Sequence, residues 1–98
     1  MDGQYAQHIL ENAKQDTLDY AERYSITDEK WLEISFLWRV SKEIHFYYAK
    51  MNPTYQYGQA TWDYYTTEKI CDFYEKRYYE KQEELEQERS RDLWQTIL

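Results

Sequence analysis

The chain has few of the residues that interrupt a helix or cross-link a fold. Its 98 residues include two glycines, one proline and one cysteine. The lone Cys71 excludes a disulfide within the chain. Glycines only at positions 3 and 58 exclude phosphate-binding loops, dinucleotide-binding loops and the Gly-x-Ser-x-Gly elbow of hydrolases, which all need clustered glycines. A helical protein without these nucleotide or nucleophile motifs is the expectation.

Metal ligands are equally scarce. The two histidines, His8 and His45, are far apart, and His-x-x-x-His, Cys-x-x-Cys and Glu-x-x-His pairs are all absent. His8 and Glu11 share one helical face, but this spacing is common among surface residues. We therefore expect no structural metal and no cofactor.

Cys71 is the one candidate nucleophile, and its neighbours argue against that role. A reactive thiol needs an electropositive setting, whereas Asp72 and Glu75 supply negative charge. A small buried apolar residue is the expected role of Cys71. The carboxylates are numerous enough for Mg²⁺, but the ordered Glu-x-x-Glu and Glu-x-x-Asp pairs of all-helical nucleotide pyrophosphatases are not reproduced. We expect no catalytic residues, so the protein is predicted not to be an enzyme.

Positive charge and long apolar runs are also lacking. The net charge of −7 argues against binding a nucleic-acid backbone or an anionic membrane, and favours a protein partner with a basic surface. The N-terminal sequence MDGQYAQHIL has neither a basic segment nor an apolar one, and no run approaches the length of a membrane span. We expect a cytoplasmic protein with no membrane contact.

The residues that are present predict an all-α fold. A hydrophobic fraction of 42% and an aromatic fraction of 19% are enough for one folded domain. Apolar spacing predicts three helices over about 4–24, 28–51 and 61–96 in a bundle-like arrangement, with the apolar second helix in the centre. Asp2 and Thr27 are the expected N-caps of the first two helices. The first helix is expected to bury one face, made of Ala6, Leu10, Ala13, Thr17, Tyr20 and Tyr24.

The third helix is too long for a small globule. Residues 61–88 alone would extend about 42 Å at 1.5 Å per residue, whereas a 100-residue globule has a radius of gyration of about 13 Å. We therefore expect the helix to bend or find a partner, most simply in a two-fold dimer. Its last segment, SRDLWQTIL, ends on four apolar residues that either fold back on the core or bind a partner: Leu93, Trp94, Ile97 and Leu98.

Tyrosines and carboxylates gather in the second half of the chain. Nine of the 12 tyrosines lie between Tyr47 and Tyr79, more rings than a core of this size is expected to bury. Acids on the third helix follow three- and four-residue steps and form one outer stripe. The acidic stripe is either a solvated face of the helix or a ridge that docks on a partner. The tyrosine rings of the loop either pack in the core or form an interface. The predicted partner-binding residues are Tyr55, Tyr57, Tyr64, Tyr65, Glu68, Asp72, Glu75, Tyr79, Glu83 and Glu86.

These features predict a small, acidic, non-catalytic protein-binding module. In composition it is similar to the inhibitors that phages and mobile elements direct at host nucleic-acid enzymes. This similarity implies an inhibitor or adaptor that docks on a basic surface of its partner. If that surface normally holds nucleic acid, the protein would act as a nucleic-acid mimic. Two alternatives stay open: a structural subunit of a larger assembly, and an all-helical Mg²⁺-dependent nucleotide hydrolase.

Overall fold

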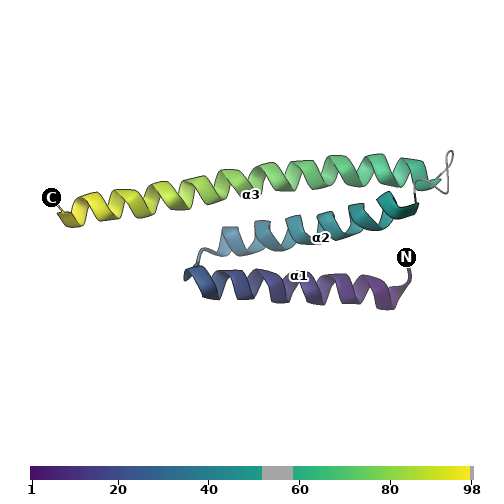
Figure 1. Ribbon diagram of the computed structural model, residues 1–98, viewed down its shortest axis with the longest axis horizontal. Helices are drawn as coiled ribbons and strands as arrows, with labels where there is room; N and C mark the ends of the chain where they lie inside the picture. The colour runs from purple at the N-terminus through teal and green to yellow at the C-terminus, as the bar shows by residue number, and fades with distance from the viewer. Residues whose placement is uncertain (52–58, 98) are drawn as a thin grey trace.

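The computed structural model describes residues 1–51 and 59–97, which contain three α-helices and no strand (Figure 1). The helices are α1 (Gly3–Tyr24), α2 (Glu29–Met51) and α3 (Gln59–Ile97). The predicted all-α class is confirmed, and the helix ends lie within two residues of the expected ones.

The three helices lie side by side in one layer with α2 in the middle (Figure 1). Helix α2 packs against both α1 and α3, while the described backbones of α1 and α3 are not in contact. The layer measures 61 × 24 × 16 Å. Its 24 Å width corresponds to two interhelical spacings of about 8–10 Å plus the helices' own radii. The central position of α2 is as predicted, but the expected bundle is not confirmed, because the helices form an open layer.

Small residues bring α1 and α2 close together. One row of α1 with strict four-residue spacing is buried: Ile9, Ala13, Thr17 and Ala21. The Thr17 and Ser35 hydroxyl oxygens lie 3.4 Å apart across this contact. At the other end of the helix pair, the Tyr5 and Tyr47 rings are 5.3 Å apart. The helices therefore run antiparallel and touch along rows of residues four apart, the packing expected of crossed helices.

This packing corrects the predicted face of α1. Leu10 and Tyr24, which we expected to be buried, are exposed, whereas Ile9 and Ala21 are buried in their place. Alternating three- and four-residue steps describe a stripe parallel to the helix axis. A crossed neighbour instead selects a row of four-residue steps, and the sequence does not specify the crossing angle.

The helix caps agree with the prediction at α1 and differ at α2. Asp2 Oδ1 accepts a hydrogen bond from Tyr5 N at 2.8 Å, as expected of an N-cap. Helix α2 is capped by Asp28, whose Oδ1 accepts from Trp31 N at 2.9 Å, so the prediction of Thr27 was wrong by one residue. The turn explains the shift, because Ile26 packs against the core and leaves Thr27 exposed.

The core is a set of packed rings near the start of α2. Trp31 is fully buried, with its ring 5.6 Å from Tyr20 of α1 and 6.0 Å from Tyr78 of α3. Trp38 stacks on Tyr78 with ring centres 4.3 Å apart. Rings from all three helices thus meet near the turn between α1 and α2.

Gln82 connects these rings through hydrogen bonds. Its Oε1 accepts from Trp31 Nε1 at 3.1 Å, and its Nε2 donates to the hydroxyls of Tyr78 and Tyr20 at 3.1 and 3.2 Å. One side chain of α3 therefore satisfies polar groups of α1, α2 and its own helix.

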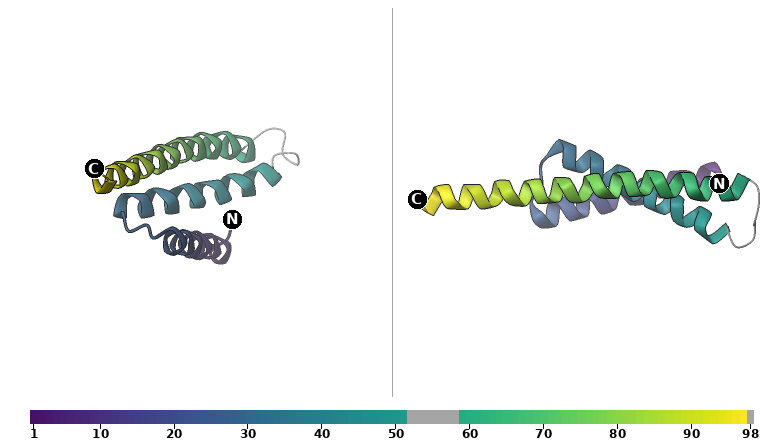
Figure 2. Two further views of the ribbon diagram at one scale, coloured as in Figure 1. Left: turned by 60° about the vertical axis from the view of Figure 1, so that its left-hand side comes forward. Right: turned by 90° about the horizontal axis from the view of Figure 1, so that it is seen from above.

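Helix α3 extends well beyond its neighbours. Its 39 residues span about 58 Å at 1.5 Å per residue. Arg89 reaches back to donate to the Tyr24 carbonyl at 3.4 Å, and residues 90–97 then project past α1 and α2 (Figure 2). Trp94 is 64% exposed on this projection and Leu93 is exposed beside it. The C-terminal segment therefore does not fold back on the core at these two residues.

Candidate protein-binding surface on α3

Helix α3 gathers eight of the ten predicted partner-binding residues on one side. Because α3 is unbroken, their three- and four-residue spacing places them in a strip about 33 Å long, at 1.5 Å per residue over 22 steps. Tyr55 and Tyr57 lie outside the described residues. We call the other eight the acidic–tyrosine strip: Tyr64, Tyr65, Glu68, Asp72, Glu75, Tyr79, Glu83 and Glu86.

The strip carries five carboxylates, three of them exposed to solvent. Asp72, Glu83 and Glu86 are exposed, while Glu68 and Glu75 are half-buried. Among the described residues, none of these five forms an ion pair. Carboxylates one turn apart create a negative surface that attracts Lys and Arg side chains.

Tyr64 connects one end of the strip to α2. Its ring lies 5.0 Å from that of His45. The negative charge of Glu68, one helical turn further along α3, raises the pKa of Tyr64. Tyr64 therefore lies between a ring of α2 and a carboxylate of the strip.

Tyr79 lies at the middle of the strip, against the core. Its ring is 57% exposed, yet its centre is 6.2 Å from Trp38 and 5.5 Å from Tyr78. Trp38 and Tyr78 thus contact one side of Tyr79, while more than half of its surface is exposed. A ring held in this way loses little conformational entropy when a partner covers it.

Sequence reasoning missed three apolar residues on the outer side of α3. Trp62 is 72% exposed, and Ile70 and Phe73 are exposed as well. The guanidinium of Arg77 lies 5.4 Å from the centre of the Phe73 ring. The neighbouring Cys71 is buried, as expected from the sequence. The sequence could have indicated that Trp62 and Phe73 are exposed, because they lie on the side of the helix opposite Cys71 and Tyr78.

Comparison with protein-family models, with curated proteins and with solved structures finds no match to this chain. The function is therefore inferred from the residues and their geometry.

The buried thiol is not placed for catalysis. Cys71 packs between α2 and α3, and burial raises the pKa of its thiol. The thiol therefore stays protonated at neutral pH, whereas a nucleophile needs the thiolate. Within residues 1–51 and 59–97, no three His, Cys, Asp or Glu side chains are grouped closely enough to hold a metal ion. No helix in these ranges is long and apolar enough to cross a membrane.

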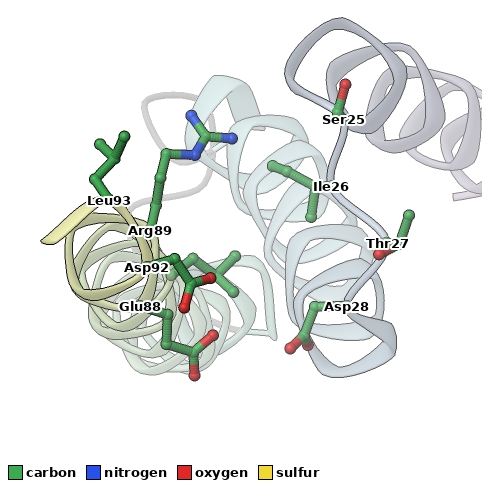
Figure 3. A pocket seen from close by; sticks show the side chains of 9 residues that line it. Ser25, Ile26, Thr27, Asp28, Glu88, Arg89, Asp92 and Leu93 are labelled. Carbon is green, nitrogen blue, oxygen red and sulfur yellow. The ribbon is translucent and has the colours of Figure 1, made fainter. Parts of the chain in front are cut away.

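A groove lies where the projecting part of α3 passes the turn between α1 and α2 (Figure 3). It has a volume of about 620 Å³ and is open to solvent. Ile26 lies on the turn side, while Arg89, Asp92 and Leu93 line the α3 side. Its lining mixes apolar and charged groups without a ring or a ligand cluster, so the strip remains the stronger candidate surface.

Proposed function

We propose that the protein is a small, non-catalytic binding module, an inhibitor or adaptor, whose acidic–tyrosine strip docks on a basic surface of a protein partner. The observation that carries this proposal is the strip itself. Along one side of an unbroken helix lie five carboxylates that form no ion pair with any described residue and three tyrosines, of which Tyr79 rests on Trp38.

The two kinds of side chain would have different roles. Exposed carboxylates mainly steer association and make it salt-dependent, while a ring that loses its water on binding slows dissociation. Tyr79 is the proposed anchor, because it is more than half exposed and rests on Trp38. Asp72, Glu83 and Glu86 are the proposed steering groups.

The chemistry of the strip favours Lys- and Arg-rich partners. Carboxylates one helical turn apart are separated by about 5–6 Å, close to the spacing of phosphates along a nucleic-acid strand. A protein surface that normally holds nucleic acid would therefore fit the strip, and the module would act as a mimic that blocks or recruits that protein in the cytoplasm.

We further propose that the chain acts as a dimer. Its projecting helix and its open layer both leave apolar side chains uncovered. The same observation supports a second function, that of a structural subunit within a larger assembly. A purified chain that forms a discrete dimer favours the module, whereas aggregation in isolation favours the subunit.

Affinity capture with three forms of the protein tests the strip. The first is the natural sequence, and the second carries Asp72→Lys, Glu83→Lys and Glu86→Lys. The third carries Glu11→Lys, Asp19→Lys and Glu22→Lys, three exposed positions on α1. Both variants change the net charge from −7 to −1, so they differ only in where the charge lies.

We expect the natural protein and the α1 variant to capture the same basic partner from the source cell, and the strip variant to lose it. Circular dichroism should show equal helix content in all three. Equal capture by the two variants would mean that the strip is only a solvated face.

A further inference from the structure

The crossing of α1 and α2 divides the layer into two unlike faces. The helices touch along Ile9, Ala13, Thr17 and Ala21 of α1. On one side of this row, Asn12 and Asp16 meet Arg39 and Lys42 of α2 across a polar pocket. On the other side, the next row of α1 contains Leu10, Lys14 and Leu18.

The next row of α2 is apolar on the same side. In each helix, the row that follows the contact row by one residue lies to one side of it. Because the two helices are antiparallel, these two following rows lie on the same side of the helix pair. Ser35 marks the contact row of α2 through its approach to Thr17. The row after it contains Phe36, Val40 and Ile44, all only half-buried.

Helix α3 continues both faces. Tyr64 and Tyr79 contact the polar side of α2 through His45 and Trp38, so the acidic–tyrosine strip borders the polar face. On the opposite side, Ile34 of α2 and Arg77 of α3 line one pocket. Ile70 lies two turns before Arg77 on that same side and is 45% exposed. The apolar face thus crosses all three helices, and its members are Leu10, Leu18, Phe36, Val40, Ile44 and Ile70.

A single layer of helices leaves such a face without cover. Stable domains normally pack two layers around a shared apolar core, and this layer is only 16 Å deep. The face is about 24 Å wide and about 33 Å long, since α1 has 22 residues at 1.5 Å each. These dimensions, on the order of 800 Å², are those of the whole side of the layer with its charged residues included, and they match the area that each partner buries in a standard stable interface.

We propose that a second copy of this chain covers the apolar face, so that two layers stack face to face around a two-fold axis. A two-fold interface uses the same patch on both subunits, and the matching area lets one copy cover the other. This inference rests on the self-association proposed above and names its surface, and it does not depend on the strip's partner.

The charge distribution favours this arrangement. Each copy carries a net charge of −7, which opposes self-association wherever acids face one another. Around the apolar residues lie side chains of both signs, the basic Lys14, Lys30, Arg77 and Lys81 and the acidic Glu33, Glu80 and Glu84, so this side of the layer carries no excess of acid. Stacking through this face keeps both acidic–tyrosine strips at the outside of the dimer, where each remains free to bind a partner.

Solution mass, measured by sedimentation equilibrium from micromolar to near-millimolar concentration, tests the proposal. The interface variant carries Leu18→Glu and Ile70→Glu, two exposed positions that should not disturb the fold. The matched control carries Leu93→Glu and Trp94→Glu, which place the same charges on the projecting end of α3, where both residues are exposed. A second interface variant, with Leu18→Gln and Ile70→Gln, serves if the charged one fails to fold.

The natural protein and the control should show twice the chain mass of 12.3 kDa. The interface variant should be monomeric, with a dissociation constant raised at least about 100-fold because four charges would enter an apolar contact. A natural protein that stays monomeric would overturn both the face and the dimer, while the strip would still be testable by capture. A dimer that survives in the interface variants and dissociates in the control would overturn the face alone.

Discussion

Replacing Gln82 with methionine should destabilise the protein far more than the same change at Gln87. Gln82 makes three hydrogen bonds that join Trp31, Tyr20 and Tyr78, whereas Gln87 is exposed on the same helix. Methionine is similar in length to glutamine, so the change removes hydrogen bonds while roughly preserving volume.

The expected loss follows from these contacts. Each hydrogen bond contributes about 0.5–1.5 kcal/mol net, and a buried donor left without an acceptor costs about 1–3 kcal/mol. The Trp31 Nε1–H would become such a donor, because the Trp31 side chain is fully buried. We expect the free energy of unfolding to fall by about 2–4 kcal/mol for Gln82→Met and by less than about 0.5 kcal/mol for Gln87→Met.

Urea unfolding, followed by circular dichroism and tryptophan fluorescence, measures both losses. Protein concentration must be the same throughout, because self-association adds to apparent stability. A loss below about 0.5 kcal/mol for Gln82→Met would refute the view that this side chain holds the three helices together.

Three further predictions concern single sites. Asp28→Ala should lower the unfolding free energy by about 0.5–2 kcal/mol, and Asp28→Asn should lower it by less, since asparagine also caps helices. The hydrogen bond from Trp31 N, followed by the charge of Lys81, lowers the pKa of Asp28. The difference in unfolding free energy between the natural protein and the Asp28→Asn variant, measured in urea, should therefore vanish as the pH falls through and below the ordinary value of 3.8. Burial, with a smaller effect of Tyr20, raises the pKa of Tyr78 to about 12. The stability that the neutral phenol contributes should therefore be complete below about pH 10 and lost between about pH 10 and 12. The Tyr78→Phe variant should show a smaller loss over this range in thermal melts at different pH values. Ala13→Leu should destabilise by about 1–3 kcal/mol because it forces α1 from α2, whereas Gln15→Leu on the exposed side should not; equal melting temperatures would contradict the close packing.

Local structure was largely predictable from the sequence. The scarcity of glycine and proline and the apolar spacing indicated three helices, and Asp2 was recognised as a cap because its side chain precedes a periodic segment. The length of α3 was predicted for the same reason, since no residue after Gly58 interrupts it. The cap of α2 was displaced from Thr27 to Asp28 by the packing of Ile26, which is a tertiary contact.

The arrangement of the helices was harder to predict. Periodicity shows which face of a helix is apolar, but not the angle at which a neighbour crosses it, so Leu10 was wrongly expected to be buried. Nor does it show that one glutamine bonds to three distant rings. The residues of the strip were identified by spacing within one helix, whereas the apolar face became visible only when rows from three helices were placed together.

Association kinetics with the captured partner, measured at two or more salt concentrations, test the central claim most directly. For the natural protein and the α1 variant with Glu11→Lys, Asp19→Lys and Glu22→Lys, the association rate should be fast at low salt and fall steeply as salt is added. For the strip variant with Asp72→Lys, Glu83→Lys and Glu86→Lys, it should be at least about tenfold slower at low salt and nearly independent of salt. Equal rates and equal salt dependence in the two variants would show that only net charge matters, and would contradict a docking role for the strip.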